Sequence, residues 1–422
     1  MRIGIQSWGS EGDIRPFLAL GHALTDRGHQ VELVYTDIGE RNYDATAAAL
    51  GFHARAVATP VVDPQRSIEI GLRILNTRDQ LRQGLIISRE LFDPVIEPTF
   101  AAAVDLCGRS DLLIHHFIQH QSAAAAELAK IPAITVAFAP MLMPSRFIHP
   151  SGTPDFGALG NRIEWKLARV LLNHTLLKDI NRFRIGHGLA RCNDLLDDAW
   201  PSHRLNLLAA SPALFDHPPD WAAWHKLCGF LELPLHQHET VAPEVDAFLA
   251  AGPPPVFMGF GSLMPIAGNE HLQATIDTFV AASQIAGCRA IIQSEERRPS
   301  TDTVLFVQRT PHSIVFPRCA AVVHHAGAGT THTTLRAGVP SVPVPHVSDQ
   351  FAWSEELQRL DVAPAPLRRT KLTAKLLAAR ISQVLSTPAM KSSAVAISAR
   401  MQNDNGPQRA ADLIESAMAP KL

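Results

Sequence analysis

Cysteine is scarce in this chain, and the few cysteines are scattered. The 422 residues include five of them, namely Cys107, Cys192, Cys228, Cys288 and Cys319, and no two form a C-x-x-C pair. An odd number of widely spaced thiols argues against a disulfide framework, and the lack of paired cysteines argues against a zinc site. The pattern is typical of a protein of the reducing cytosol.

The chain also lacks an excess of either charge and lacks long apolar runs. Its 38 Lys and Arg residues stand against 40 Asp and Glu residues, so it has no basic footprint for nucleic acid. No apolar stretch reaches the roughly 18 residues that span a bilayer. The apolar run at the N-terminus is too short for a signal peptide. We therefore expect a cytoplasmic protein that binds no nucleic acid and makes at most peripheral contact with a membrane.

Histidine is frequent, with 20 residues, but its pattern does not indicate a metal site. There is no H-E-x-x-H motif. The densest cluster, HHFIQH at 115–120, could place His116 and His120 on one face of a strand. No carboxylate or cysteine lies at a spacing that would complete a set of ligands.

The residues that are present favour two α/β domains. Hydrophobic residues make up 46% of the chain, which is enough for packed cores, and a domain typically has about 100–200 residues. Both halves begin with the same pattern, which is an apolar strand followed by a Gly-Ser turn and a helix. We expect an N-terminal domain over 1–228, a linker over 229–254, a second domain over 255–402, and a helix within 403–422 that packs on the second domain or crosses back to the first.

Apolar runs and breaker residues predict the elements within each domain. In the first half the expected strands are 2–7, 31–35, 112–116 and 133–138, with helices that open at Pro16 and over 122–130. In the second half the expected strands are 255–262, 289–293, 320–324 and 341–345, with helices over 272–286, 330–335, 351–360 and 407–418. Ligands of open α/β sheets bind at the carboxyl ends of the strands, so the residues after each strand are the candidates for a site.

The stretch HHAGAGTT at 324–331 joins a predicted strand to a predicted helix. Its small residues let the backbone approach a ligand closely, and the free N–H groups at a helix N-terminus attract an anion. The pattern is neither a Walker A loop nor G-x-G-x-x-G. It indicates either a phosphate site or close packing of the helix on the sheet.

Three polar residues follow other predicted strands. Asp349 and Gln350 could accept and donate hydrogen bonds to the hydroxyls of a sugar, although Asp349 could equally cap the next helix. Asp13, in the loop after the first strand, could serve as a general base or as a local cap.

Taken together, these segments resemble the donor-binding signature of the family 1 glycosyltransferases. The matching stretches are TPHSIVFP at 310–317, VVHHAGAGTT at 322–331, LRAGVP at 335–340 and DQ at 349–350. The spacing from His325 to Gln350 equals that in plant members of the family. GSEGDIRPFLALGHALTDRGHQV at 9–31 is similar to the opening of the bacterial and sterol-type branch, which includes antibiotic aglycone, sterol and rhamnolipid glycosyltransferases.

The resemblance implies a GT-B fold, with two Rossmann-like domains that face each other across a cleft. It implies an inverting enzyme that moves a hexose from a UDP- or dTDP-sugar, with no cofactor and no obligatory metal. Asp13 would be the general base. The implied donor-binding residues are Ser262, Val307, Gln308, His325, Gly327, Gly329, Thr330, Asp349 and Gln350. Among these, His325 and the backbone of Gly329 and Thr330 would hold the diphosphate, and Asp349 and Gln350 would hold the sugar.

The sequence departs from the plant members at three places. Val307 stands where they have a Trp that stacks on uracil, and Thr333 stands where they have a Glu that binds the ribose hydroxyls. The second change weakens the case for UDP over dTDP, whose sugar lacks the 2′-hydroxyl. Asp13 occupies the position of their His base, and His115 or His116 lies near the position of their Asp. We therefore predict a reversed pair in which a histidine, assigned to His116, orients Asp13.

The acceptor is expected to be a small lipophilic hydroxyl compound, such as a natural product, sterol, flavonoid or hydroxy-fatty acid. The apolar segments at 136–150 and 162–177 suggest this, with Phe138, Met141 and Met143 as the candidate acceptor contacts. The same segments could equally be core. A nucleotide-sugar epimerase of the same fold and a nucleotide-binding protein without transfer activity are the alternatives.

Overall fold

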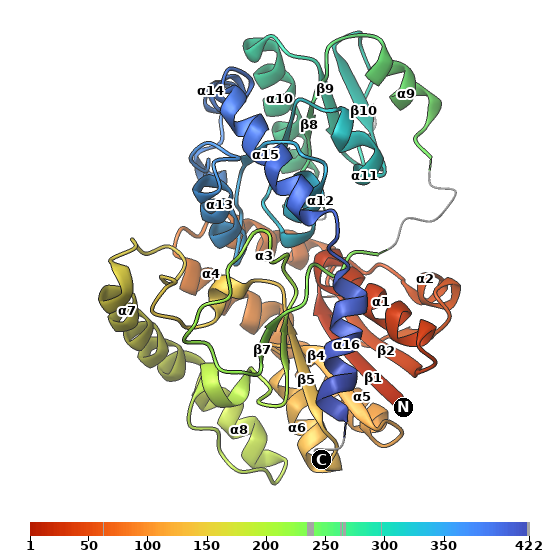
Figure 1. Ribbon diagram of the computed structural model, residues 1–422, viewed down its shortest axis with the longest axis vertical. Helices are drawn as coiled ribbons and strands as arrows, with labels where there is room; N and C mark the ends of the chain where they lie inside the picture. The colour runs from red at the N-terminus through yellow and green to blue at the C-terminus, as the bar shows by residue number, and fades with distance from the viewer. Residues whose placement is uncertain (62, 234–239, 262–263, 265–266, 297, 420–422) are drawn as a thin grey trace. The chain divides into compact units, whose positions relative to one another are not determined.

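The computed structural model describes residues 1–61, 63–233, 240–261, 264, 267–296 and 298–419 (Figure 1). Its contacts divide the chain into two compact units. The first comprises Met1–Pro60, Ser88–Pro234 and Asp404–Leu422, and the second comprises Val61–Ile87 and Leu235–Asn403. The segment Val61–Ile87, which the sequence analysis placed in an N-terminal domain over 1–228, is therefore grouped with the second unit.

The first unit is built on a seven-stranded sheet with the order β3-β2-β1-β4-β5-β6-β7, and all its pairings are parallel. Its strands are β1 (Arg2–Gly9), β2 (Gln30–Asp37), β3 (His53–Ala56), β4 (Leu112–His116), β5 (Ala133–Ala137), β6 (Asn206–Leu208) and β7 (His225–Leu227). Its main helices are α1 (Glu11–Asp26), α2 (Asp44–Ala49), α5 (Ile96–Cys107), α6 (His120–Ala129), α7 (Gly157–Leu172), α8 (Lys178–Gly186) and α16 (Gly406–Met418).

The second unit is built on a five-stranded sheet with the order β10-β9-β8-β11-β12, which is also parallel. Its strands are β8 (Val256–Met258), β9 (Ala290–Gln293), β10 (Val304–Val307), β11 (Ala321–His324) and β12 (Ser341–Pro343). Its helices are α3 (Pro64–Asn76), α4 (Gln80–Ile87), α9 (Pro243–Ala250), α10 (Gly268–Ala286), α11 (His312–Val315), α12 (Ala328–Arg336), α13 (Gln350–Arg359), α14 (Ala374–Leu385) and α15 (Pro388–Met401).

The apolar runs form the central strands because both faces of a parallel sheet are covered. All five residues of β4 are buried, and so are all four of β11. Pro343 disfavours a central strand because it has no N–H to donate. The structure accommodates it at the edge, since β12 is the outermost strand of its sheet and ends at Pro343.

The prediction that Pro16 opens the first helix was wrong. Helix α1 begins at Glu11, and Pro16 lies inside it. Ser10 and Asp13 form a capping box. The Ser10 side chain accepts a hydrogen bond from the backbone N–H of Asp13, and the Asp13 side chain accepts one from the backbone N–H of Ser10. That start signal outweighs the preference of proline for the first turn.

The terminal helix α16 belongs to the first unit, where it contacts α1 (Figure 1, blue beside red). The Arg27 guanidinium pairs with Asp412 at 2.7 Å and with Glu415 at 2.9 Å. Gly406 lies so close to the backbone that a Cβ there would meet the carbonyl oxygen of Phe230 at 2.0 Å. Only glycine fits at this contact. None of the helices in the described ranges has the length and apolar character needed to cross a membrane.

Both sheets have a point at which the direction of strand addition reverses. In the first unit it lies between β1 and β4, and in the second between β8 and β11. Ligands of such sheets bind outside the carboxyl ends of the strands at this switch point. Asp13 follows β1 and His116 ends β4, while Gly261 follows β8 and His325 follows β11. The folds thus place two groups of predicted site residues at the two switch points.

Candidate functional site

Asp13 is held in one orientation at the start of α1. Its Oδ2 accepts hydrogen bonds from the Ser10 N–H at 2.7 Å and from the Ser10 hydroxyl at 3.0 Å. The Ser7 hydroxyl donates to the Asp13 carbonyl at 2.8 Å. Because the local cap uses Oδ2, it leaves Oδ1 for another partner. The side chain is 34% exposed, so a reactant can reach it. The capping role and the catalytic role are compatible in this geometry.

The pKa of Asp13 is raised to about 6, first because the carboxyl is desolvated and also because of the nearby charge of Asp37. The hydrogen bonds from Ser10 act in the opposite direction. Asp37 pairs in register with Gly9 on the neighbouring strand, and its side chain is buried. A carboxylate with a pKa near neutrality is suited to take a proton at physiological pH. The sequence analysis missed Asp37, although its place at the end of β2 puts it at the same edge as Asp13.

His116 lies beside Asp13, with its Nε2 3.7 Å from Asp13 Oδ1. This distance exceeds that of a hydrogen bond. Burial lowers the pKa of His116 to about 3, so the ring is neutral and can donate from only one nitrogen. The rings of Phe117 and Phe138 lie 5.3 Å from the His116 ring, and Phe17 lies 6.5 Å away. These aromatic neighbours exclude water from the ring.

His115 points to a different partner. Its Nδ1 is 3.0 Å from the His116 carbonyl oxygen, and the side chain is fully buried. Of the two histidines that the sequence left open beside Asp13, His116 is the one whose ring nitrogen lies near the carboxylate, at 3.7 Å. Gly9 makes room for the carboxylate, because a Cβ at Gly9 would lie 2.3 Å from Asp13 Oδ2. Its φ of +140° is also a conformation that favours glycine.

In the second unit, His325 and Gly327 lie between β11 and α12. Gly327 is the N-cap of α12 and has no side chain with which to cap the helix. The first N–H groups of a helix have no acceptor within the helix, so α12 presents donors at this end. A Cβ at Gly327 would lie 2.5 Å from His325 Nε2, and one at Gly261 would lie 3.4 Å from His325 Cε1. The two glycines allow the imidazole to lie against the turn.

His325 Nδ1 is buried and has no hydrogen-bond partner among the described residues. Burial lowers the pKa of this imidazole to about 4, and the neighbouring His312 contributes. A neutral imidazole beside an uncapped helix N-terminus adds a further donor for an anion. Gly329 and Thr330 lie in the first turn of α12, where the sequence predicted them to contact a diphosphate.

The turn between β11 and α12 is stabilised by His324, which was not among the predicted site residues. The Ala326 N–H donates to His324 Nδ1 at 3.1 Å, and His324 Nε2 lies 2.9 Å from the Ser341 hydroxyl. Ala326 has a φ of +61°, which is strained for a residue with a Cβ. The His324 contact therefore supports the strained residue that starts the turn.

Asp349 and Gln350 follow β12 as predicted, but they engage the loop differently. Gln350 Oε1 accepts from the backbone N–H groups of His346 at 2.9 Å and Val347 at 3.1 Å. The amide nitrogen of Gln350 is left as the available donor. Asp349 occupies the N-cap position of α13, yet its side chain makes no capping hydrogen bond. The alternative that Asp349 serves as a helix cap therefore has the right position but lacks the bond.

The remaining donor candidates are less informative. Val307 is buried among the core side chains of its unit. Gln308 is exposed, and its amide nitrogen donates to the Glu295 carbonyl at 3.2 Å. Ser262 lies outside the described residues. Thr333 lies within α12 and is partly exposed.

The acceptor candidates Phe138, Met141 and Met143 are all buried in the first unit. Phe138 packs edge-on against Phe17 at 5.7 Å. Met143 Sδ lies 3.5 Å from the amide nitrogen of Asn206. In this structure the three side chains have the environment of a core, which is the second of the two possibilities that the sequence left open. Only Phe138 also contacts the ring of His116.

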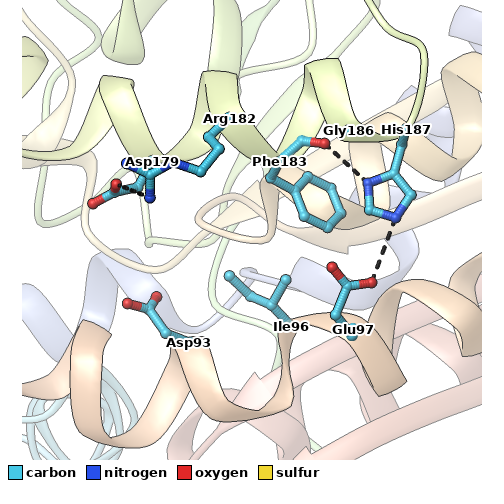
Figure 2. A pocket seen from close by; sticks show the side chains of 8 residues that line it. All are labelled: Asp93, Ile96, Glu97, Asp179, Arg182, Phe183, Gly186 and His187. Atoms are coloured by element: carbon cyan, nitrogen blue, oxygen red, sulfur yellow. Dashed lines mark hydrogen bonds and ion pairs between the residues drawn. The ribbon is translucent and has the colours of Figure 1, made fainter.

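A pocket of about 480 Å³ lies between α5 and α8 of the first unit (Figure 2). Its lining residues are Asp93, Ile96, Glu97, Asp179, Arg182, Phe183, Gly186 and His187. Arg182 pairs with Asp179 at 3.0 Å, and His187 Nε2 lies 3.4 Å from Glu97. The charged groups on its walls thus largely satisfy one another, so it is a weaker candidate than the switch points. No cluster of three or more His, Cys, Asp or Glu side chains in the described residues could hold a metal ion.

Comparison with known proteins shows similarity to glycosyltransferases over the whole chain. Residues 277–416 match the domain family described as "Erythromycin biosynthesis protein CIII-like, C-terminal domain". A sterol 3-beta-glucosyltransferase of Arabidopsis thaliana is 27% identical over 440 residues, which cover 100% of this chain and 69% of that protein. The O-mycaminosyltylonolide 6-deoxyallosyltransferase of Streptomyces fradiae is 28% identical, with 98% and 97% covered. An uncharacterised glycosyltransferase of Mycobacterium leprae is 30% identical, with 98% and 96% covered.

Solved structures show the same fold over the whole chain. The glycosyltransferase of kitacinnamycin superposes with a TM-score of 0.71 at 18% identity, and 99% of each chain is covered. The glycosyltransferase VinC, solved in complex with dTDP, superposes with a TM-score of 0.65 at 19% identity, and 99% of each chain is covered. The predicted GT-B architecture of two parallel α/β sheets is thereby confirmed.

Proposed function

Because the chain belongs to the family of sterol- and antibiotic-type glycosyltransferases, which use nucleotide sugars, we propose that it is an inverting enzyme with Asp13 as its base. The proposed donor is a UDP- or dTDP-hexose, and the proposed acceptor is a hydroxyl group of a small lipophilic compound. The reaction needs no obligatory metal. The observation that carries this proposal is the oriented carboxylate of Asp13, whose pKa is raised to about 6.

In the proposed step, the acceptor oxygen attacks the anomeric carbon of the sugar. The bond from that carbon to the diphosphate oxygen breaks, and the nucleoside diphosphate leaves. The acceptor proton passes to Asp13 Oδ1, since Oδ2 is held by Ser10. His116 acts as a positioning residue, because its neutral ring limits the orientations and the hydration of Oδ1. Proton removal by a placed carboxylate typically accelerates such a step about 10²–10⁴-fold.

The donor site is proposed at the N-terminus of α12. Negative charge develops on the leaving diphosphate, and the donors of an uncapped helix N-terminus can stabilise it. His325, whose Nε2 lies beside Gly327 at this end of the helix, supplies a further donor without adding a fixed charge. Asp349 accepts from the sugar hydroxyls, and the amide nitrogen of Gln350 donates to them. This arrangement supports metal independence, because protein donors take the role that Mg²⁺ has in other transferases.

The names of the relatives bear on the substrates. VinC is described in complex with dTDP, and Thr333 in place of a ribose-binding Glu agrees with a nucleotide that lacks the 2′-hydroxyl. The relatives are named for sterol and O-mycaminosyltylonolide, which supports a lipophilic acceptor such as a sterol, another natural product, a flavonoid or a hydroxy-fatty acid. The same names do not favour an epimerase or a nucleotide-binding protein without transfer activity.

Nucleotide binding is tested by thermal shift with UDP, dTDP and GDP. We expect UDP or dTDP at about 100 times its Kd to stabilise the chain by about 2.7 kcal/mol. Gly327→Ala should abolish the shift, because its Cβ would displace His325. Gly84→Ala is the matched control, since a Cβ there meets nothing within 4 Å. The proposal fails if no nucleotide raises the melting temperature, or if Gly327→Ala responds like the control.

The position of Asp13 is tested through Gly9. We expect Gly9→Ala to lower kcat by roughly 10²-fold, because displacing a catalytic group by about 1 Å has effects of this size. The new Cβ would lie 2.3 Å from Asp13 Oδ2. Gly12→Ala is the control in the same turn, with its nearest contact, Ser10 Oγ, at 3.5 Å. Equal turnover of the two variants with a nucleotide sugar would show that Gly9 does not position the base.

A further inference from the structure

The outer face of α7 carries an uncovered apolar stripe. The side chains of Phe156, Leu159, Ile163, Leu167, Val170 and Leu171 are between 48% and 74% exposed. At 3.6 residues per turn, the four from Leu159 to Val170 fall within about 80° of one another around the helix axis. Soluble proteins rarely leave a contiguous apolar patch of this kind uncovered unless it binds something.

The stripe is exposed although α7 itself is packed against the first unit. Its opposite face is buried through Asn161 and Trp165. The Trp165 indole N–H donates to the Ile148 carbonyl at 2.7 Å, and the Asn161 amide donates to Asp155 at 2.9 Å. The helix is therefore attached to the first unit by the face that carries Asn161 and Trp165, while the apolar stripe remains exposed.

Basic side chains lie beside the stripe on one flank, and an acidic side chain lies on the other. Arg162 and Lys166 lie on one flank, are exposed, and make no ion pair among the described residues. On the other flank, Glu164 accepts a hydrogen bond from the Thr153 hydroxyl at 3.1 Å. Arg169, on the same flank as Arg162, is paired with Asp194 at 2.8 Å, so this flank offers two cations, Arg162 and Lys166, that pair with no carboxylate among the described residues.

We propose that this face of α7 docks on an anionic lipid surface. The apolar side chains would enter the boundary of the acyl chains, and Arg162 and Lys166 would meet the lipid phosphates, as in interfacial amphipathic helices. A second copy of the chain is less suited to cover the face. A two-fold interface pairs a patch with itself, so it would bring further unneutralised cations to the rim. The proposal does not rest on the proposed function, because lipid binding requires neither donor nor acceptor.

The test is flotation of the full chain with vesicles of phosphatidylcholine alone or mixed with phosphatidylglycerol. We expect the chain to float with the anionic vesicles and only weakly with the neutral ones. The triple variant Leu159→Ser, Leu167→Ser, Val170→Ser should lower the apparent partition coefficient roughly tenfold or more. Arg162→Gln with Lys166→Gln should remove the preference for anionic vesicles.

A matched control is Ile285→Ser, Leu376→Ser, Val395→Ser, which removes three exposed apolar side chains from helices of the second unit. This variant should float like the unmodified chain. The α7 proposal is overturned if the chain binds neither vesicle or if the two triple variants float alike. It is also overturned if light scattering shows a dimer, formed without lipid, that the α7 variant dissociates. Because all six sites are exposed, melting curves of the variants should match and exclude unfolding as the cause.

Discussion

Asp13→Asn is expected to lower the turnover of sugar transfer by roughly 10²–10⁴-fold while leaving nucleotide binding unchanged. The amide keeps an oxygen that can accept from Ser10, so the capping hydrogen bonds at 2.7 and 3.0 Å can persist. The amide cannot accept the acceptor proton. A comparison of kcat with the nucleotide-induced thermal shift separates these two effects. Near-normal kcat in this variant would exclude Asp13 as the base.

The raised pKa of Asp13 also predicts how turnover depends on pH on the acid side. Only the ionised carboxylate can take a proton, and burial raises the pKa of Asp13 to about 6. Turnover should therefore be highest above this pH and fall about tenfold per unit below it. Asp37→Asn removes the nearby charge that raises the pKa, so its acid limb should move to lower pH. His116→Ala admits water to Oδ1, which should also move the limb to lower pH. An unchanged limb in both variants would contradict the proposed environment of Asp13.

Much of the fold could be predicted because strand patterns are local. Strand β4 was predicted with its observed bounds, and the strand before His325 begins one residue later than expected. Once parallel strands are placed, the residues that follow them must lie at one sheet edge. This is why Asp13 and His325 could be placed at the carboxyl ends of their strands from the sequence. The helix start at Glu11 was missed because two local signals, the capping box and Pro16, compete there.

Side-chain partners were harder to predict because a sequence pattern places a residue on an element but does not specify which group its side chain contacts. Gln350 was expected to hold sugar hydroxyls, and the sequence did not indicate that its amide oxygen accepts from the backbone of the preceding loop. Val307 was expected to contact the donor nucleotide; its side chain is part of a hydrophobic core, and the donor contact stays a prediction. Asp37, at the end of β2, raises the pKa of Asp13 in α1, and His324 contacts Ser341 of the adjacent strand β12. No short sequence motif specifies either contact.

Acid is expected to unfold both units between about pH 6 and 4. Six histidines are buried, three in each unit, and the pKa of each imidazole is lowered by desolvation; they are His115, His116, His120, His324, His332 and His346. The unfolded chain binds protons near the usual pKa of about 6.5, whereas the folded chain does not. Their neutral forms therefore contribute stability that is fully present above pH 6.5 and is lost as the pH falls.

The size of this effect is large relative to the stability of a domain. At pH 5, each histidine that stays neutral in the folded state costs about 2 kcal/mol relative to pH 7. Three of them cost on the order of 6 kcal/mol per unit, against a typical total of about 5–15 kcal/mol. Asp13, Asp37 and Asp93 act in the opposite direction, since burial raises the pKa of each. These three carboxyls lie in the first unit and offset part of the loss there, so the second unit should unfold at the higher pH.

Melting temperatures measured from pH 8 to pH 5 test this expectation. His332→Gln keeps a donor for the Ala328 carbonyl, which lies 2.7 Å from His332 Nδ1, and removes one proton-binding group. The variant should be less stable than the unmodified chain at pH 8 but should lose less stability on acidification. The slope of stability against pH reports the difference in bound protons between the unfolded and folded states. If His332→Gln and the unmodified chain lose stability in parallel as the pH falls, His332 takes up a proton while still folded.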